Sequence, residues 1–359
     1  MSLALRWSVG AAAAVALAAP GAAQAASKSV FMGTPPSASK SLQKYGADVN
    51  AYFPSSIAIH VGDSVKFAPV GFHDVHFLGR SGKPTTPFIP SGKTIAGVND
   101  VAGIPFWFNG QAELAPNPKV FTPAGKLGKT VVTNGTKEIY SGAPVTDKPK
   151  PMTVRFTKAG LFRYVCDIHP GMKGAVRVVS RRKPVPSKRA DARRVRLQVS
   201  KAISVAKGLG SASTPANTVD VGRAGKGGVS LFGYVPDKLT VPVGTTVTFR
   251  MRPGDYETHT ATTGPGDPQK GPSTYLGALA ASLEAPTARQ EALYPSDLPV
   301  APAALTPASH GNGFWNSGAL DAISASPLPQ QNAVKFAAAG TYDVYCMIHP
   351  FMHATITAQ

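Results

Sequence analysis

The sequence of 359 residues predicts an all-β protein with two β-sandwich domains joined by a basic, part-helical linker. The first observation is a repeated loop: "YVCDIHPGM" (Tyr164–Met172) returns as "YCMIHPFM" (Tyr345–Met352), with Cys, His and Met in the same spacing. The second is that the strand-like segments around each loop repeat as well. The third is composition: 36 Gly and 33 Pro, with many Val, Thr and Ser, favour turn-rich β structure. This length can supply each domain with its own core.

The N-terminal residues have the layout of a secretory signal peptide. Residues 1–26 contain one Arg, an apolar run and the sequence Ala23-Gln24-Ala25, which fits a cleavage site. The alternative is an uncleaved membrane anchor, but the run is rich in Ala and Gly and is broken by Pro20. Cleavage is therefore favoured, and no later segment is apolar enough to span a bilayer. We expect an exported protein that is extracellular, at the cell surface or periplasmic.

The repeat predicts the strands in order along each half. Val49–Phe67 aligns with Val229–Phe249, and each segment shows two short strands joined by a V-G turn. Val154–Cys166 aligns with Val334–Cys346, each being a strand, an A-G turn and a second strand with alternating aromatic and β-branched residues. A last strand follows each Met, as "KGAVRVV" or "HATITA". Several short strands separated by Gly and Pro turns are typical of a β-sandwich.

The domain boundaries follow from the repeat and from a shift in charge. We expect domain 1 at residues 27–180, a basic linker at 181–222 and domain 2 at 223–359. Half of the net charge of +18 lies in residues 181–210, which hold ten Lys or Arg and one Asp. Residues 187–210 can form a helix that ends at the glycines Gly208 and Gly210. The charge favours an acidic redox partner or an anionic cell surface, while export argues against nucleic acid; a solvated connector is the alternative.

The chain has two cysteines, and their neighbours indicate metal binding. A disulfide would have to join the same loop of two domains, and it would not explain the His and Met beside each Cys. In C-x2-H-x2-M one short turn offers a thiolate, an imidazole and a thioether. The two sulfur groups are soft ligands that suit copper, and a thioether is a poor zinc ligand. The proline after each His stiffens the turn. The motif therefore predicts copper.

A further His must come from an upstream segment in each half. In the first half "FHDVHF" offers His73 and His76. Alternation along a strand places His73 on the same face as Val75 and Phe77, the apolar and inward set, so His73 is favoured over His76. In the second half "YETHTAT" offers only His259.

These residues resemble the cupredoxins of the plastocyanin and amicyanin kind. The motif H-[ND]-V-x-F is met by His73–Phe77, and Y-x-C-x2-H-P-x-M is met by Tyr164–Met172 and, with the Tyr directly before Cys346, by Val344–Met352. The resemblance covers both halves but not the linker. It implies Greek-key sandwiches, one type 1 (blue) copper in each, single-electron transfer, and an exposed edge of His169 or His349 as the electron port. The ligands carried over are His73, Cys166, His169 and Met172 in the first site, and His259, Cys346, His349 and Met352 in the second.

The sequence departs from the family pattern in two respects. The Asn that usually follows the first His is Asp74 in one half and Thr260 in the other, so the bond that ties the two ligand segments can differ. Each half also carries an insertion, Gly79–Gly110 or Gly264–Pro295. Both follow the first ligand strand, so we expect them near the copper end, where they would cap the site or form a partner surface.

Three classes of function are compatible with two copper sites. We favour an electron carrier over an enzyme. A copper-dependent oxidase or nitrite reductase needs further copper centres, built from H-x-H pairs or from a His next to the Cys, and the chain has neither. Copper binding or delivery without electron transfer is the third class. The histidines outside the ligand sets are expected to lie at the surface or to serve other roles: His60, His76, His310 and His353.

Overall fold

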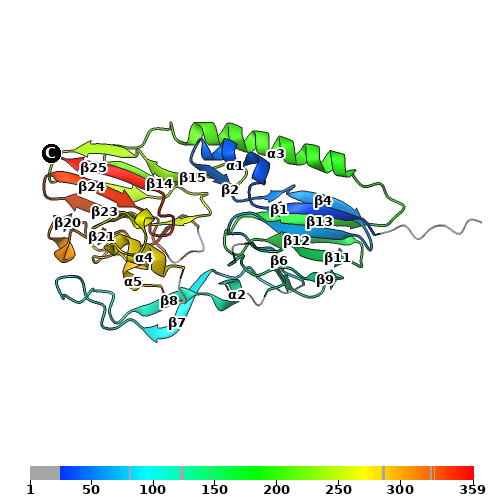
Figure 1. The fold of residues 1–359 in the computed structure, drawn as a ribbon, viewed down its shortest axis with the longest axis horizontal. Helices are drawn as coiled ribbons and strands as arrows, with labels where there is room; N and C mark the ends of the chain where they lie inside the picture. The colour runs from blue at the N-terminus through cyan, green and yellow to red at the C-terminus, as the bar shows by residue number, and fades with distance from the viewer. Residues whose placement is uncertain are drawn as a thin grey trace, which may run out of the picture.

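The computed structural model describes residues 25–80, 82–121, 125–146, 148–284, 288–323, 326 and 328–359. The predicted signal peptide, apart from its last two residues, lies outside this part of the chain. Among the described helices, none combines the length and the apolar character that crossing a membrane requires. Figure 1 shows two β-rich halves side by side, with one long helix lying across both. The all-β class predicted from the sequence is confirmed.

In the first half, two five-stranded sheets pack face to face. Their strand orders are β3-β1-β5-β11-β9 and β10-β6-β12-β13-β4. Both sheets contribute to one core, in which Phe67 and Tyr164 are fully buried with ring centroids 5.1 Å apart. The strands are β1 Ser27–Met32, β3 Tyr52–Phe53, β4 Ser56–His60, β5 Ser64–Pro69, β6 His76–Phe77, β9 Thr130–Thr133, β10 Ile139–Tyr140, β11 Met152–Phe156, β12 Gly160–Val165 and β13 Lys173–Val179.

The second half repeats this arrangement. Its sheets have the orders β2-β15-β14-β17-β23-β20 and β16-β25-β24-β19-β21, and the core between them contains Phe249 and Phe336. A short pair, β18 Thr258–His259 with β22 Leu320–Asp321, lies beside them. The remaining strands are β14 Thr218–Gly225, β15 Val229–Val235, β16 Lys238–Val241, β17 Thr246–Arg250, β19 Thr262–Thr263, β20 Ala303–Leu305, β21 Trp315–Asn316, β23 Gln331–Phe336, β24 Gly340–Tyr345 and β25 His353–Ala358.

One strand of the second sandwich comes from the first half of the sequence. β2 (Ala47–Val49) pairs antiparallel with β15, so that Val49 lies opposite Val229. A helix from the first half, α1 (Pro36–Gln43), packs beside β2 and buries Leu42. The edge of one domain is therefore completed by the other, which fixes how the two halves meet.

The predicted helix in the basic segment is present as α3 (Lys188–Leu209). The Ser187 side chain accepts a hydrogen bond from Ala190 N at 3.2 Å and so caps the N-terminus, and Gly210 follows the last turn. Regular structure of the second half begins at Thr218, in β14, which lies within the range expected to be linker.

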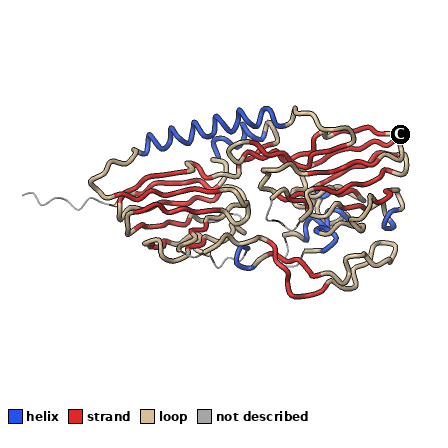
Figure 2. Tube along the Cα trace, turned by 180° about the vertical axis from the view of Figure 1, so that it is seen from behind, coloured by secondary structure: helices blue, strands red, loops and turns tan. Residues whose placement is uncertain are grey.

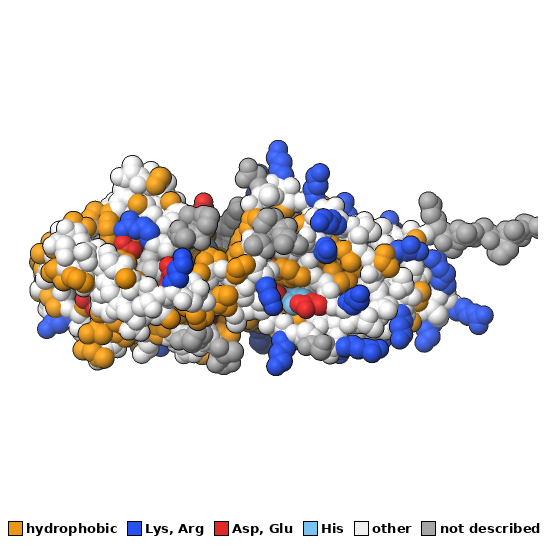
Figure 3. Space-filling view, turned by 90° about the horizontal axis from the view of Figure 1, so that it is seen from below, with side chains coloured by type: hydrophobic (Ala, Val, Ile, Leu, Met, Phe, Trp, Pro, Cys, Tyr) orange, Lys and Arg blue, Asp and Glu red, His pale blue; other side chains and the backbone are white. Residues whose placement is uncertain are grey.

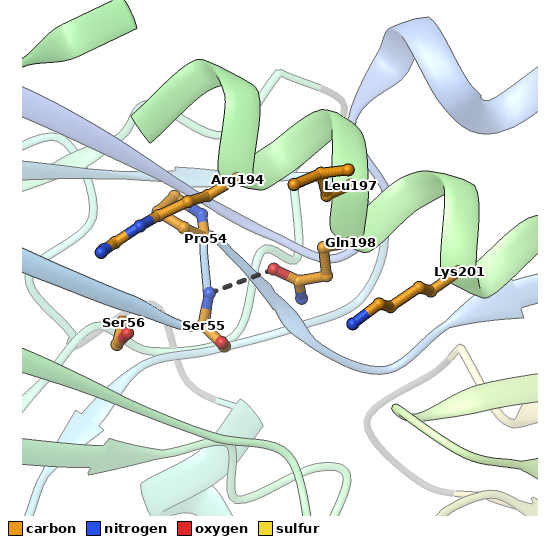
Figure 4. A pocket seen from close by; sticks show the side chains of 7 residues that line it. All are labelled: Pro54, Ser55, Ser56, Arg194, Leu197, Gln198 and Lys201. Atoms are coloured by element: carbon orange, nitrogen blue, oxygen red, sulfur yellow. Dashed lines mark hydrogen bonds between the residues drawn. The ribbon is translucent and has the colours of Figure 1, made fainter. Parts of the chain in front are cut away.

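The basic segment is exposed on one side only. Arg193, Arg194 and Arg196 are exposed, but Ala202 and Ala206 are buried against α1, β2 and β15, because small side chains allow a close approach. Gln198 also fastens α3 to the first half: its Nε2 donates to Tyr52 O at 2.9 Å and its Oε1 accepts from Ser55 N at 3.3 Å. Figure 4 shows the bond between Ser55 and Gln198, in a groove that Arg194 and Lys201 also line.

The insertion of the first half reaches across to the second half. It carries β7 (Phe88–Thr94), which pairs with β8 (Ala112–Pro116), and Figure 2 shows this ribbon extending beneath the second half. Phe106 and Phe108 share a buried cluster with Leu276, on α4, and with Met347. The Trp107 Nε1–H donates to Pro295 O at 2.9 Å. The insertion thus covers the loop that follows Cys346. The short helices are α2 Pro118–Phe121, α4 Tyr275–Ser282, α5 Gln290–Leu293, η1 Pro268–Lys270 and η2 Ser309–Gly311.

Because the halves share a sheet and a core cluster, we expect them to unfold together. Leu42 is 1% exposed at this junction, so Leu42→Ala should lower the free energy of unfolding by about 2–5 kcal/mol. Leu197→Ala on the exposed side of α3 is the matched control and should change it by less than about 0.5 kcal/mol. Calorimetry should show one unfolding transition, and its midpoint temperature should fall in Leu42→Ala. Two separate transitions in the wild type would contradict the shared junction.

Candidate metal centres

In the first half, the loop between β12 and β13 meets the segment before β6. Backbone bonds close the loop, with Cys166 N donating to Met172 O at 3.0 Å and Met172 N donating to His169 O at 3.0 Å. The Nδ1 atoms of His73 and His169 are 3.0 Å apart, and Cys166 Sγ lies 3.6 Å from His169 Nδ1. One ligand atom from each of these three residues lies within 4.8 Å of the other two, and all three residues are buried.

The same geometry occurs in the second half. The loop between β24 and β25 is closed by Met352 N donating to His349 O at 2.9 Å. The Nδ1 atoms of His259 and His349 are 3.1 Å apart, and Cys346 Sγ lies 3.9 Å from each of them. His259 lies in β18, and the pairing of β18 with β22 holds it in place.

The two predicted methionines are buried next to the cysteines. Met172 is 1% exposed and belongs to the same core cluster as Cys166. Met352 is 1% exposed and belongs to the same cluster as Cys346. The structure therefore brings one thiol and two imidazoles together in each half, and the Met of the same loop is buried in the core cluster that holds the Cys. Both cysteines are free rather than joined in a disulfide.

Burial sets the protonation of these groups in the metal-free protein. Burial, with the charge of the second His of each site, lowers the pKa of His73 and of His259 to about 3. Both imidazoles are thus neutral at neutral pH and keep a lone pair for a metal. Burial raises the pKa of the Cys166 and Cys346 thiols, so a metal must displace a proton from each when it binds.

The separations between the donor atoms fit a bound transition metal. Metal–nitrogen bonds of about 2.0–2.1 Å and a metal–sulfur bond of about 2.3 Å are usual for such ligands. Nitrogen atoms 3.0–3.1 Å apart and sulfur–nitrogen separations of 3.6–3.9 Å match those bond lengths around one central ion. Two imidazoles and a thiolate, with a thioether nearby, favour copper over zinc.

Two glycines that sequence reasoning missed make room for the upstream histidines. A Cβ on Gly33 would lie 2.5 Å from His73 Cδ2, and a Cβ on Gly222 would lie 2.7 Å from His259 Nε2. Both residues have positive φ, 102° and 74°, which favours Gly. Gly33 directly follows β1 and Gly222 lies in β14, and these two strands have matching places, since each pairs in parallel with the strand before the upstream His.

The residue after the upstream His ties the two ligand segments together in both halves, with different chemistry. The Asp74 carboxylate accepts a bond from Asp167 N at 2.8 Å. The Thr260 hydroxyl accepts one from Met347 N at 2.8 Å, and Thr260 N donates to Cys346 Sγ at 3.3 Å. Both replacements of Asn therefore keep the connection between the two ligand segments. At this position a carboxyl group is present in the first site and a hydroxyl group in the second.

His76 lies apart from the first site, yet the alternation that was expected to turn it outward does not expose it. His76 is 1% exposed, with its Nδ1 2.7 Å from Asp167 Oδ2 and its Nε2 2.6 Å from Glu138 Oε1. An ion-paired imidazole can be buried where an unpaired one could not. Burial alone thus cannot separate His73 from His76, whereas the donor geometry does.

The other histidines outside the two sites are held by carboxylates. His310 lies 3.3 Å from both Asp100 and Asp297, although it comes from the second half. His353 lies 2.9 Å from Asp343, and His60 lies 3.6 Å from Asp63. None of these contacts joins either ligand group.

The expected electron port of the first site is covered. His169 is 7% exposed, and its Nε2 lies 3.4 Å from Oε1 of Glu257, a buried residue of the second half. The other oxygen, Oε2, lies 3.7 Å from His349 Nε2. The His349 side chain keeps 20% of its surface exposed. Sequence reasoning missed Glu257, because an acidic residue two positions before His259 has no motif of its own.

Comparisons with known proteins give similarity to solved cupredoxin structures only. No family model matches the chain, and no curated relative matches it. A mutant of amicyanin in its reduced Cu(I) form is 19% identical over 42% of this chain and 87% of its own, with a TM-score of 0.21. A purple cupredoxin from Nitrosopumilus maritimus is 19% identical over 40% of this chain and 98% of its own, with a TM-score of 0.20. Plastocyanin from Dryopteris crassirhizoma is 21% identical over 40% of this chain and 99% of its own, with a TM-score of 0.20. These scores are too low to carry an argument about the site.

Substitutions of the two neighbouring histidines should have different effects. His73→Ala removes a converging Nδ1, so metal binding at the first site should be lost with little change in the second. His76→Ala should leave the site able to bind metal but destabilise the fold by about 1–3 kcal/mol, because Asp167 loses its partner. Metal titration and thermal melting of both variants measure this. Metal loss in His76→Ala but not in His73→Ala would contradict the assignment.

Proposed function

We propose that the protein is an exported electron carrier that holds one type 1 copper in each half. The observation that carries this proposal is the repeated convergence of one Cys and two His, with a buried Met in the same loop, in each half. The sequence of the N-terminus supports export. Copper in such a site supplies a one-electron change between Cu(I) and Cu(II).

The protein contributes rigidity and exclusion of water. Each loop is closed by backbone hydrogen bonds, and the upstream His rests on a glycine that admits no other side chain. Donor groups that are held in place before the metal binds need to move little when its charge changes. Soft sulfur ligands support Cu(I), while imidazoles suit both oxidation states.

The second site is the side at which a redox partner approaches. His349 is partly exposed, and its ring lies 5.0 Å from Phe232 and 6.0 Å from Phe351, which is 58% exposed. The first site has His169 covered by the other half. Of the two expected ports, the exposure of His349 supports the one at the second site.

The partner is expected to be an acidic redox protein, with an anionic cell surface as the alternative. Figure 3 shows Lys and Arg side chains gathered over the first half and fewer of them over the second. The exposed arginines of α3 add to this charge. Such a field raises the rate of encounter with an acidic protein.

An oxidase or nitrite reductase is less well supported. Those enzymes require additional copper centres, and the histidines outside the two ligand groups are each held by carboxylates rather than paired with one another. Copper delivery without electron transfer is distinguished by measurement, since a carrier exchanges electrons rapidly while it retains its metal.

Removal of one cysteine should bleach one site only. In Cys166→Ser the second half keeps its own four ligands, so we expect one copper per chain and about half of the visible thiolate-to-copper absorption. Cys346→Ser should give the mirror result. Absorption spectra and copper analysis of both variants measure this. Loss of all colour in either single variant would contradict two separate sites.

The reduction potentials of the two sites should respond differently to pH. Burial, with the charge of Asp167, raises the pKa of Asp74 to about 6. As pH rises through this range, Asp74 ionises beside Cys166, and the added negative charge stabilises Cu(II) and lowers the potential of the first site. One coupled proton gives at most about 59 mV per pH unit. Thr260 carries no charge at the corresponding place beside the second site, so this residue adds no such slope there.

Redox titration of the single-site variants separates these responses. Cys346→Ser reports the first site and Cys166→Ser the second. Asp74→Asn should flatten the pH response of the first site. A slope at the first site that survives in Asp74→Asn would show that another group is responsible.

Neutralisation of α3 should slow electron transfer to an acidic acceptor. Arg193, Arg194 and Arg196 are exposed, so replacing them with Gln should lower the rate roughly ten-fold at low salt without changing either copper spectrum. The rates should converge at high salt, because the Debye length falls from about 30 Å at 0.01 M to about 10 Å at 0.1 M. Identical salt curves for variant and wild type would make α3 a connector only.

A further inference from the structure

One buried carboxylate lies between the two candidate metal centres. Glu257 is 4% exposed, and its two oxygens are directed to different sites. Oε1 lies 3.4 Å from His169 Nε2 in the first half, and Oε2 lies 3.7 Å from His349 Nε2 in the second. Since Nδ1 is the converging atom in both histidines, Glu257 meets the opposite edge of each ring.

The position of Glu257 is fixed by contacts between the halves. Asn50, which follows β2, donates from Nδ2 to Glu257 Oε1 at 2.6 Å. Asn50 is itself held, because its backbone N donates to Gly228 O at 2.7 Å beside the pairing of β2 with β15. The neighbouring Tyr256 packs so closely on the first ligand loop that a Cβ on Gly171 would lie 2.3 Å from its ring.

This placement has a direct consequence for the histidines. An imidazole that binds a metal through Nδ1 carries its proton on Nε2, and a carboxylate close to Nε2 favours that tautomer. The two oxygens of one buried side chain thus face one ligand ring in each site.

We infer that Glu257 is a positioning residue shared by both metal centres, so that one side chain sets the metal affinity of two sites that are far apart in the sequence. This inference rests on the proposed function for the identity of the metal. It goes beyond that function because it makes the two sites depend on one group that belongs to neither ligand set, although each half supplies its own ligands.

The geometry predicts different results for two substitutions. Glu257→Ala removes both contacts, so copper affinity should fall by about 10–100-fold at each site. In Glu257→Gln the amide oxygen should stay at the Oε1 position, because Asn50 donates a hydrogen bond there. The amide NH₂ then faces the Nε2–H of His349, donor against donor. Glu257→Gln should therefore weaken the second site more than the first.

The experiment is a copper titration in single-site backgrounds. Cys346→Ser isolates the first site and Cys166→Ser the second, each combined with Glu257→Ala or Glu257→Gln. Glu113→Ala and Glu113→Gln, which change a half-buried residue bonded to Ser91, are the matched controls and should leave both affinities unchanged. Equal affinities for Glu257 and Glu113 variants at either site would overturn the inference.

A measurement on the metal-free wild-type chain keeps the inference testable if the Glu257 variants fold poorly. Nitrogen-15 NMR of the imidazoles should show a proton on Nε2 of both His169 and His349. A neutral His349 with its proton on Nδ1 would overturn the inference, whatever metal the protein binds. If the wild type binds copper without thiolate absorption, the proposed function fails, and this tautomer result still decides the role of Glu257.

Discussion

The pairing of β2 with β15 is the interaction on which the arrangement of both sites depends. It lends a strand of the first half to the sheet of the second, and it places Asn50 where it binds Glu257. With α3 across both halves and the first insertion packed on the second, Glu257 of the second half lies beside His169 of the first. A tandem protein whose halves moved freely would leave His169 open to solvent, whereas here it is buried.

The two sites share their donor atoms but differ in their surroundings. The first has Asp74 and the pair of Asp167 with His76 next to the Cys166 loop, and its His169 is enclosed. The second has Thr260 and Met347 in the corresponding places and a partly exposed His349. Buried charge next to a thiolate changes the balance between oxidation states, so the proposal implies two unequal carriers, of which the second meets the partner.

The sequence predicted the parts that depend on local pattern. Strand alternation, Gly and Pro turns and the repeated Cys and His gave the sandwich class and the residues that converge, and Gly210 gave the end of α3, whereas Gly208 lies inside the helix. It did not predict contacts between the halves, because pairing of β2 with β15 and burial of Ala202 depend on surfaces distant in sequence. Alternation failed for His76 because a carboxylate partner offsets the cost of burial, and Glu257 was missed because its role exists only once two loops meet.

The central claim is that each half assembles its own blue copper site from one Cys, two His and one Met. The most direct measurement is the visible spectrum of the purified, oxidised wild-type protein together with its copper content. The account predicts two coppers per chain and strong thiolate-to-copper absorption. Copper bound without that absorption, or a stoichiometry of one copper or none in protein saturated with the metal, would contradict it.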